Sequence, residues 1–318
     1  MKYFVSRLAS LVPTLLLASA GIFLLMRILP GDVAKLMLLG PEGNGIARPE
    51  DLAAIRAELG LDRPLVIQYL DWLLGMARLD VGDSLITHQP VFDELFSRLP
   101  VTLELGLLAT VTSLFISIPL GVLAAVKRNS WMDYTARVFS LAGLSVPTFW
   151  VGMLMILVLV QYLHWTAPLG YSGLTEDPLK NVQQLIWPIL ALGYAQAGLV
   201  ARLVRSSLLE VLREDYVRTA RSKGLKENDV IIRHALRNSM LPVITVIGLG
   251  LANIVGGTVI VETVFSLPGV GRLMVDSINR RDYPIVQTAT FIFALVFALA
   301  NLTVDLLYAV LDPRIRLT

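Results

Sequence analysis

Long apolar runs alternate with short charged segments along the whole chain. Each run contains no Asp, Glu, Lys or Arg, and the six runs are 8–26, 105–126, 138–163, 181–201, 238–261 and 283–304. A helix needs roughly 20 apolar residues to cross the hydrocarbon of a bilayer. Only helices and closed barrels satisfy their backbone hydrogen bonds there. The pattern therefore predicts an all-α, polytopic membrane protein with six transmembrane helices.

The first apolar run could belong to a cleaved signal peptide or to a helix that stays in the protein. Lys2 and Arg7 precede it, and Ala18-Ser19-Ala20 resembles a signal-peptidase site. The apolar residues continue through Met26, past the usual length of a cleaved signal. We therefore expect an uncleaved first helix.

The runs divide the chain into three expected parts. Residues 1–26 form a first transmembrane helix with a cytoplasmic N-terminus, and 27–104 form an external loop subdomain with short helices. Residues 105–318 form a five-helix transmembrane core that contains a cytoplasmic loop, 202–237. This division follows from the positions of the charged segments alone.

Basic residues set the expected orientation. With the N-terminus inside, the inner segments hold 16 Lys and Arg in 68 residues, against 11 in 116 residues on the other side. Cytoplasmic loops of membrane proteins carry an excess of positive charge. We therefore expect both termini to lie in the cytoplasm.

The composition argues against metal binding and ATP hydrolysis by this chain. Of the 318 residues, 16% are charged, whereas a soluble domain averages about 25%. The sequence has no cysteine, and its three histidines fall in different loops, which argues against a metal site. No lysine follows a glycine, as a P-loop requires. We expect no cofactor, no metal and no catalytic residue, so any ATP hydrolysis comes from partner subunits.

The external loop contains signals for two short helices. Pro49-Glu50-Asp51 is typical of a helix start and Gly60 of a helix end, and a second helix is expected from Pro64 to Arg78. The apolar face of the second helix, which we interpret as a packing surface, comprises Leu65, Tyr69, Trp72, Leu73 and Met76. The loop has a net charge of −5. That charge fits either a solvated surface or a docking surface for a soluble partner.

The loop 202–237 predicts a helix, a glycine corner and a second helix. Glu210 with Arg213 and Glu214 with Arg218 are spaced to share a helix face, and Gly224 favours the left-handed conformation that ends a helix. Asn228 could cap the second helix. The small residues between the helices would let another surface approach closely; they are Thr219, Ala220, Ser222 and Gly224. The alternative is an interfacial helix that lies on anionic lipid.

This loop resembles the docking segment of ABC importer permeases. Residues 215–225 (DYVRTARSKGL) are close to the form found in the dipeptide/oligopeptide/nickel permease family. Arg218 and Thr219 replace the Glu and Ala of the general motif, and Pro242 follows the glycine at a longer spacing than is usual. Further segments similar to this family occur in the same order along the chain: 30–32, 59–65, 98–105, 233–238, 262–271 and 311–314.

The resemblance implies an inner-membrane permease with type I ABC importer architecture. It implies a second homologous permease subunit, two cytoplasmic ATPase subunits or domains, and an external substrate-binding protein as partners, within membrane lipids and without nucleic acid. Di- or oligopeptides are the expected cargo, with nickel, glutathione or another small solute as alternatives.

The resemblance also suggests site residues. The ATPase-coupling candidates are Glu214, Asp215, Tyr216, Arg218, Thr219, Ala220, Lys223, Gly224 and Leu225. The outer-gate candidates are Phe265, Pro268, Gly269 and Gly271, although the same segment could be a tight loop followed by a short helix to Arg280. Neutral polar candidates for the pathway are Thr245, Asn253, Gln287 and Asn301.

An ion-gradient-driven secondary carrier is the main rival class. Proton-coupled carriers usually keep ionisable groups inside the membrane, and the six runs contain none, with Glu104 and Asp305 at their ends. A sodium site built from carbonyl groups would escape this argument. A channel is a third possibility, in which the docking loop would have no purpose.

Overall fold

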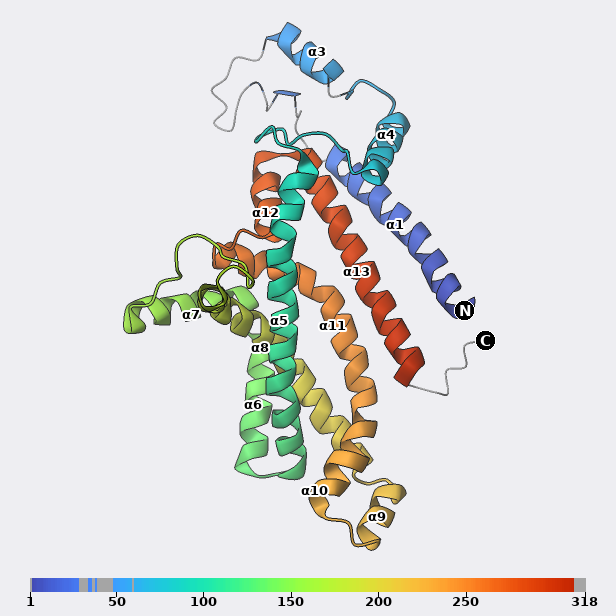
Figure 1. Ribbon diagram of the computed structural model, residues 1–318, viewed down its shortest axis with the longest axis vertical. Helices are drawn as coiled ribbons and strands as arrows, with labels where there is room; N and C mark the ends of the chain where they lie inside the picture. Colours follow the sequence, from blue (N-terminus) through green and yellow to red (C-terminus); the bar gives the residue numbers. More distant parts are fainter. Residues whose placement is uncertain (1, 29–33, 36–37, 39–47, 59, 312–318) are drawn as a thin grey trace. The chain divides into compact units, whose positions relative to one another are not determined.

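The computed structural model describes residues 2–28, 34–35, 38, 48–58 and 60–311, except for the side chains of 2–10, 58, 249, 251–255 and 304–311 (Figure 1). Apart from one isolated antiparallel bridge between Asp83 and Pro90, the regular structure in these ranges is helical. Five helices are long and apolar enough to cross a membrane, and a bent helix pair raises the number to six. The predicted all-α, polytopic fold is confirmed.

The chain forms two compact units. Unit 1 combines Met1–Pro100 with Pro268–Thr318, and unit 2 is Val101–Leu267. The helix α5 (Val91–Val126) contains the boundary between them. The predicted division into 1–26, 27–104 and 105–318 describes expected membrane topology and stays a prediction.

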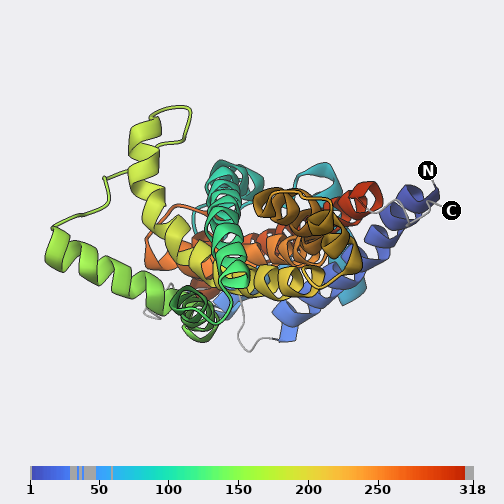
Figure 2. The ribbon, with the colours of Figure 1, turned by 90° about the horizontal axis from the view of Figure 1, so that it is seen from below.

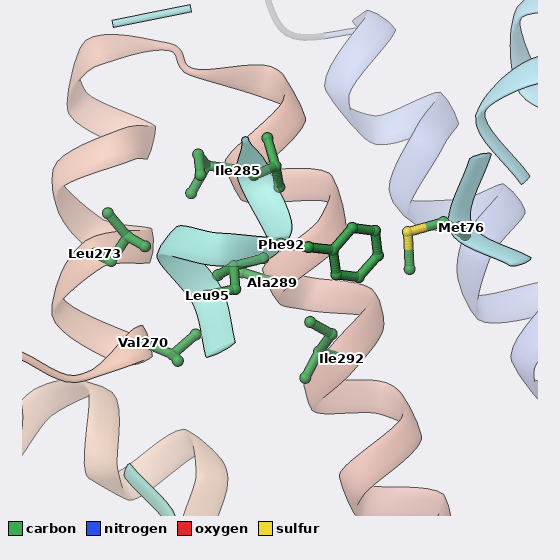
Figure 3. Close-up of a cluster of buried hydrophobic side chains, with 9 residues drawn as sticks. Met76, Phe92, Leu95, Val270, Leu273, Ile285, Ala289 and Ile292 are labelled. Carbon is green, nitrogen blue, oxygen red and sulfur yellow. The ribbon is translucent and has the colours of Figure 1, made fainter. Parts of the chain in front are cut away.

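Unit 1 contains α1 (Lys2–Ile28), α3 (Pro49–Glu58), α4 (Leu65–Arg78), α12 (Val270–Arg280) and α13 (Tyr283–Leu311). Its main core joins α4, the start of α5, α12 and α13 (Figure 3). The buried side chains are Met76, Val91, Phe92, Leu95, Val270, Leu273, Ile285, Ala289 and Ile292.

The two predicted loop helices are confirmed as α3 and α4. Pro64 immediately precedes α4, and Gly60 has a φ of +64° after α3. The apolar face of α4 packs within unit 1, because the Tyr69 and Trp72 rings contact the Phe23 ring of α1 with centroids 5.5 and 6.4 Å apart. Leu65, expected on this face, is half exposed.

Unit 2 contains the rest of α5 and α6 (Trp131–Ser145), α7 (Thr148–Leu163), α8 (Pro178–Val211), α9 (Asp215–Ser222), α10 (Glu227–Asp229), the π-helix η1 (Val230–Leu236) and α11 (Arg237–Val264). The long helix α8 packs against α6, α7 and α11. Glycines in α8 allow the backbones of α6 and α5 to approach it closely. A Cβ on Gly198 would lie 2.9 Å from the Ser140 carbonyl oxygen of α6, and one on Gly193 would lie 2.9 Å from that of Ala109 in α5.

The expectation of one continuous helix over 138–163 is wrong. The run is divided between α6 and α7, whose axes differ by 107° (Figures 1 and 2). Pro147 disfavours helical backbone at the preceding residue, and Val146 is extended, with φ −90° and ψ 125°. The chain therefore leaves α6 and starts α7 in a new direction.

Several helices extend beyond the charge-free runs, and the extensions carry ionisable side chains. Asp133 in α6 is fully buried, and Arg205 of α8 donates to its two carboxylate oxygens at 2.6 and 2.9 Å. Glu262, near the end of α11, is also buried and accepts a hydrogen bond from Thr102 at 2.7 Å. The expectation that the spans lack ionisable groups therefore holds for the apolar runs, but it is wrong for the helices that contain them.

Gly121→Val is expected to weaken the packing of α5 on α8. A Cβ at Gly121 would lie 2.7 Å from the Ala201 carbonyl oxygen and from the Val204 Cβ, and overpacking typically costs about 1–3 kcal/mol. The matched control is Gly21→Val, because no atom lies within 4 Å of a Cβ at Gly21. Thermal unfolding of both variants in mild detergent checks this. Equal melting temperatures would contradict it.

Candidate functional site

The coupling corner, defined as residues 214–229, connects α8 to η1 in unit 2. Glu214 is extended, with φ −66° and ψ 147°, and α9 begins at Asp215. An acid in the first turn and Arg221 in the last turn both suit the helix dipole. Gly224 follows with a φ of +78°, so the predicted left-handed glycine corner is confirmed.

The inner face of α9 is apolar and holds the corner on the rest of unit 2. Val217, Ala220 and Val230 are buried together, with Val211 and Leu212 packed around them. Ala220 is 7% exposed. Its small side chain therefore serves packing inside the chain, which differs from the expectation that it leaves room for another surface.

The outer face of the corner is polar and exposed. Of the coupling candidates, only Ala220 points inward; the exposed ones are Glu214, Asp215, Tyr216, Arg218, Thr219, Lys223, Gly224 and Leu225. The space beside Gly224 is open, because no atom lies within 4 Å of a Cβ placed there.

Local polar contacts fix the shape of this face. Arg221 donates to both carboxylate oxygens of Glu227 at 2.7 and 3.1 Å, across the glycine corner, and this hydrogen bonding raises the pKa of Arg221. Asn238 donates to the Tyr216 hydroxyl at 2.8 Å, which ties α9 to the start of α11. The Lys223 side chain makes no ion pair with any residue that the structure describes.

Two local predictions are wrong. Arg218 pairs with Asp215, at 3.4 Å, and its expected partner Glu214 lies outside the helix in extended backbone. Asn228 does not cap the second helix, because α10 begins one residue earlier, at Glu227. The first difference arises because the chain leaves α8 after Val211 and starts a separate helix at Asp215. The second arises because Asn228 lies inside α10, whose N-cap is Lys226.

The corner lies at the same end of unit 2 as the α5–α6 turn (Figure 1). Ala125 of α5, Leu208 of α8 and Ala235 of η1 form one buried cluster there. The sequence places 127–137 and 202–237 on one side of the membrane, and this cluster is compatible with that arrangement.

The outer-gate candidates lie along the chain from the end of α11 to the first turn of α12. Phe265 is half-buried, and its ring would be 3.1 Å from a Cβ on Gly152 of α7. Gly269 immediately precedes α12, and Gly271 is buried in its first turn. A short helix ending at Arg280 is confirmed, and a gating role for Phe265, Pro268, Gly269 and Gly271 stays a prediction.

The pathway candidates have different surroundings. Thr245 donates back to the Leu241 carbonyl oxygen at 3.2 Å. Gln287 is buried, and its amide nitrogen has no hydrogen-bond partner in the described part of the chain. It lines a cavity of about 380 Å³ in unit 1. Asn301 is half-buried, whereas the side chain of Asn253 lies outside the described residues.

A polar cluster at the start of α8 was missed by the sequence analysis. The Tyr171 hydroxyl donates to the Glu104 carboxylate at 2.7 Å, and Asn181 donates to the Ser172 carbonyl oxygen at 3.1 Å. Burial and the hydrogen bond to Glu104 raise the pKa of Tyr171, so its hydroxyl stays protonated at neutral pH. Glu104 and Tyr171 are 67 residues apart, and no sequence spacing signals such a contact.

In the described ranges, no group of three or more His, Cys, Asp or Glu side chains is arranged so that it could hold a metal ion.

Comparison with known proteins gives the family. Residues 117–317 match the family described as "Binding-protein-dependent transport system inner membrane component", and residues 1–106 match its N-terminal companion. A putative peptide transport system permease protein of Brucella abortus (strain 2308) is 42% identical over 310 residues, which cover 98% of this chain and 97% of that protein. A glutathione transport system permease protein of Salmonella typhi is 40% identical over 316 residues, which cover 99% of each.

The matches extend over nearly the whole chain and agree with its candidate spans. Such a component is a non-catalytic transport subunit, which requires a binding protein and an ATPase. The chain therefore belongs to the binding-protein-dependent transport system inner membrane components, as a multi-pass permease subunit of an ABC importer.

Proposed function

We propose that this permease forms half of the translocation pathway of an importer for di- or oligopeptides. It pairs with a second homologous permease, and two cytoplasmic ATPase subunits or domains drive the pair. The relatives named as peptide permeases, at 42% identity, support peptide cargo. The relatives named as glutathione permeases, at 40% identity, make glutathione, itself a tripeptide, the second candidate.

The coupling corner is the part of this chain that we assign to ATPase docking. The observation that carries the assignment is the two-faced character of α9: Val217 and Ala220 are buried, while the opposite face is exposed. A short helix anchored on one side can transmit a push from a partner to α8 and α11. In this proposal the corner and both termini lie in the cytoplasm, and α3 and α4 face the binding protein.

Copurification tests the proposed partners and cargo. A tagged copy purified in mild detergent is expected to bring a second permease, ATPase subunits and a binding protein that retains peptide, all identifiable by mass spectrometry. Glu50→Lys/Asp51→Lys reverses two exposed acids at the start of α3, and we expect it to lose the binding protein but keep the ATPases. A binding protein loaded with glutathione would favour the second candidate cargo. Unchanged recovery of the binding protein would contradict its docking on α3.

Gly224→Asp tests the docking surface, with Gly224→Asn as its matched control. Both side chains tolerate the left-handed backbone, both enter open space, and they differ in charge. An unpaired carboxylate buried against a partner costs several kcal/mol. We therefore expect the Asp variant to lose most ATP-driven uptake and the Asn variant to keep most of it. Equal uptake by both variants at the original level would contradict ATPase docking at this corner.

A further inference from the structure

A cavity of about 210 Å³ lies between α5, α6 and α8 in unit 2. Small or apolar side chains form most of its wall, and they are Gly121, Ala124, Ala136, Ser140, Leu141 and Ala201. Three arginines complete it: Arg137, Arg202 and Arg205. An apolar hollow bordered by guanidinium groups suits a molecule with an apolar chain and an anionic head.

Two of the three arginines, Arg137 and Arg205, lie against one carboxylate, that of Asp133. Arg205 is engaged with the buried Asp133 through two hydrogen bonds, whereas the Arg137 Nε lies 3.5 Å from the same carboxylate and makes no hydrogen bond in the described chain. The exposed Arg202 forms no ion pair with a described residue. The cavity therefore carries an excess of two positive charges, on Arg137 and Arg202.

The cavity lies near the end of α5, and the residues around it are of the kinds found where lipid meets water. Ala124 is two residues before the end of α5, and the α5–α6 turn that follows carries Lys127 and Arg128, both exposed. Trp131, 70% exposed, begins α6, and Trp is enriched at membrane–water interfaces. The neighbouring outer face of α6 is apolar and exposed at Val138 and Leu141.

We propose that this cavity binds one anionic phospholipid, with the phosphate on Arg137 and Arg202 and an acyl chain on the apolar wall along α6. Charge complementarity favours this occupant, because basic pockets between membrane helices attract anionic headgroups. A protein surface seated here would need acids to neutralise the same two arginines. The proposal concerns this chain alone and does not depend on the cargo or the ATPases.

Native mass spectrometry of the full-length purified protein tests the site. The protein is titrated with phosphatidylglycerol, with phosphatidylethanolamine and with inorganic phosphate. We expect one phosphatidylglycerol to bind at least tenfold more tightly than phosphatidylethanolamine, and phosphate alone to bind weakly. Arg137→Gln/Arg202→Gln is expected to lose about tenfold or more in phosphatidylglycerol affinity, since each basic group near a lipid surface contributes about a fivefold factor.

The matched control is Arg213→Gln/Lys223→Gln, which removes the same charge from exposed residues at the same end of unit 2 but outside the cavity. It should bind phosphatidylglycerol as the unmodified protein does. If the double variant fails to fold, the loss of phosphatidylglycerol affinity is measured on the single variant Arg202→Gln. Equal losses in both double variants, or equal affinity for the two lipids, would overturn the proposal. Strong binding of phosphate alone would overturn the lipid assignment. Occupation of the cavity by a second protein subunit in the purified complex would also overturn it.

Discussion

Arg205→Leu is expected to lower the melting temperature of the purified permease by roughly 5 °C or more. Asp133 is fully buried and accepts two of its hydrogen bonds from Arg205. Without that guanidinium the carboxylate keeps the Asn129 amide, at 2.9 Å, and the longer ion pair with the Arg137 Nε, at 3.5 Å. Removing one partner of a buried ion pair typically costs about 3–5 kcal/mol, because the other charge stays buried without compensation.

A double-variant comparison separates this loss from a simple loss of packing. Asp133→Leu/Arg205→Leu removes both charges, and replacing a buried ion pair by apolar residues is often neutral or stabilising. We therefore expect the double variant to melt above Arg205→Leu, although it loses the contact to the Asn129 amide. Thermal unfolding in the same detergent measures all three proteins. A double variant that melts at or below the single one would show that the pair contributes through packing.

Ala220→Arg is expected to abolish ATP-driven uptake. The Ala220 side chain is buried against Val217 and Val230, so a guanidinium there must either bury an unpaired charge or lift α9 from η1. Burying an unpaired charge is among the most destabilising single changes. Uptake into vesicles that contain the complete importer measures the effect.

Thr219→Arg is the matched control for the anchoring of α9, because it places the same side chain on the exposed face of the helix, one residue away. Since Thr219 belongs to the proposed docking face, this control applies to the digestion experiment and not to uptake. Limited trypsin digestion distinguishes the two variants. Cleavage at Lys223 and Lys226 should become faster in Ala220→Arg, because α9 is released, and stay unchanged in Thr219→Arg. Normal uptake by the Ala220→Arg variant would contradict an anchored coupling corner.

The identity of the transported solute depends on a partner of this chain. Its family relatives are named for peptides and for glutathione. In the proposed importer, the external binding protein selects the solute. The copurification experiment therefore identifies the solute that the binding protein retains. The variants of Gly224 and Ala220 test the coupling of uptake to ATP hydrolysis, and that test does not depend on which solute is carried.

Local signals allowed much of the fold to be predicted. Pro49 and Pro64 marked the starts of α3 and α4, and Gly224 marked the corner after α9, because a proline ring and a left-handed glycine act on the backbone where they stand. The bend after α6 was different. Pro13, Pro119, Pro188 and Pro242 lie inside helices, whereas the chain bends at Pro147. Neighbouring helices decide whether a proline is accommodated.

The sequence by itself determined the membrane class, the positions of the apolar runs and the resemblance to the family, because these depend on the lengths of the runs and on contiguous motifs. It did not determine the bend that divides the run 138–163 into two helices. Only the tertiary structure decided which face of α9 is buried, so that Ala220 turned from a candidate contact into a packing residue. It also joined Asp133 to Arg205 across 72 residues, and Tyr171 to Glu104. Such pairs form because packed helices bring distant positions together and buried charges require partners there, and no local spacing along the chain encodes them.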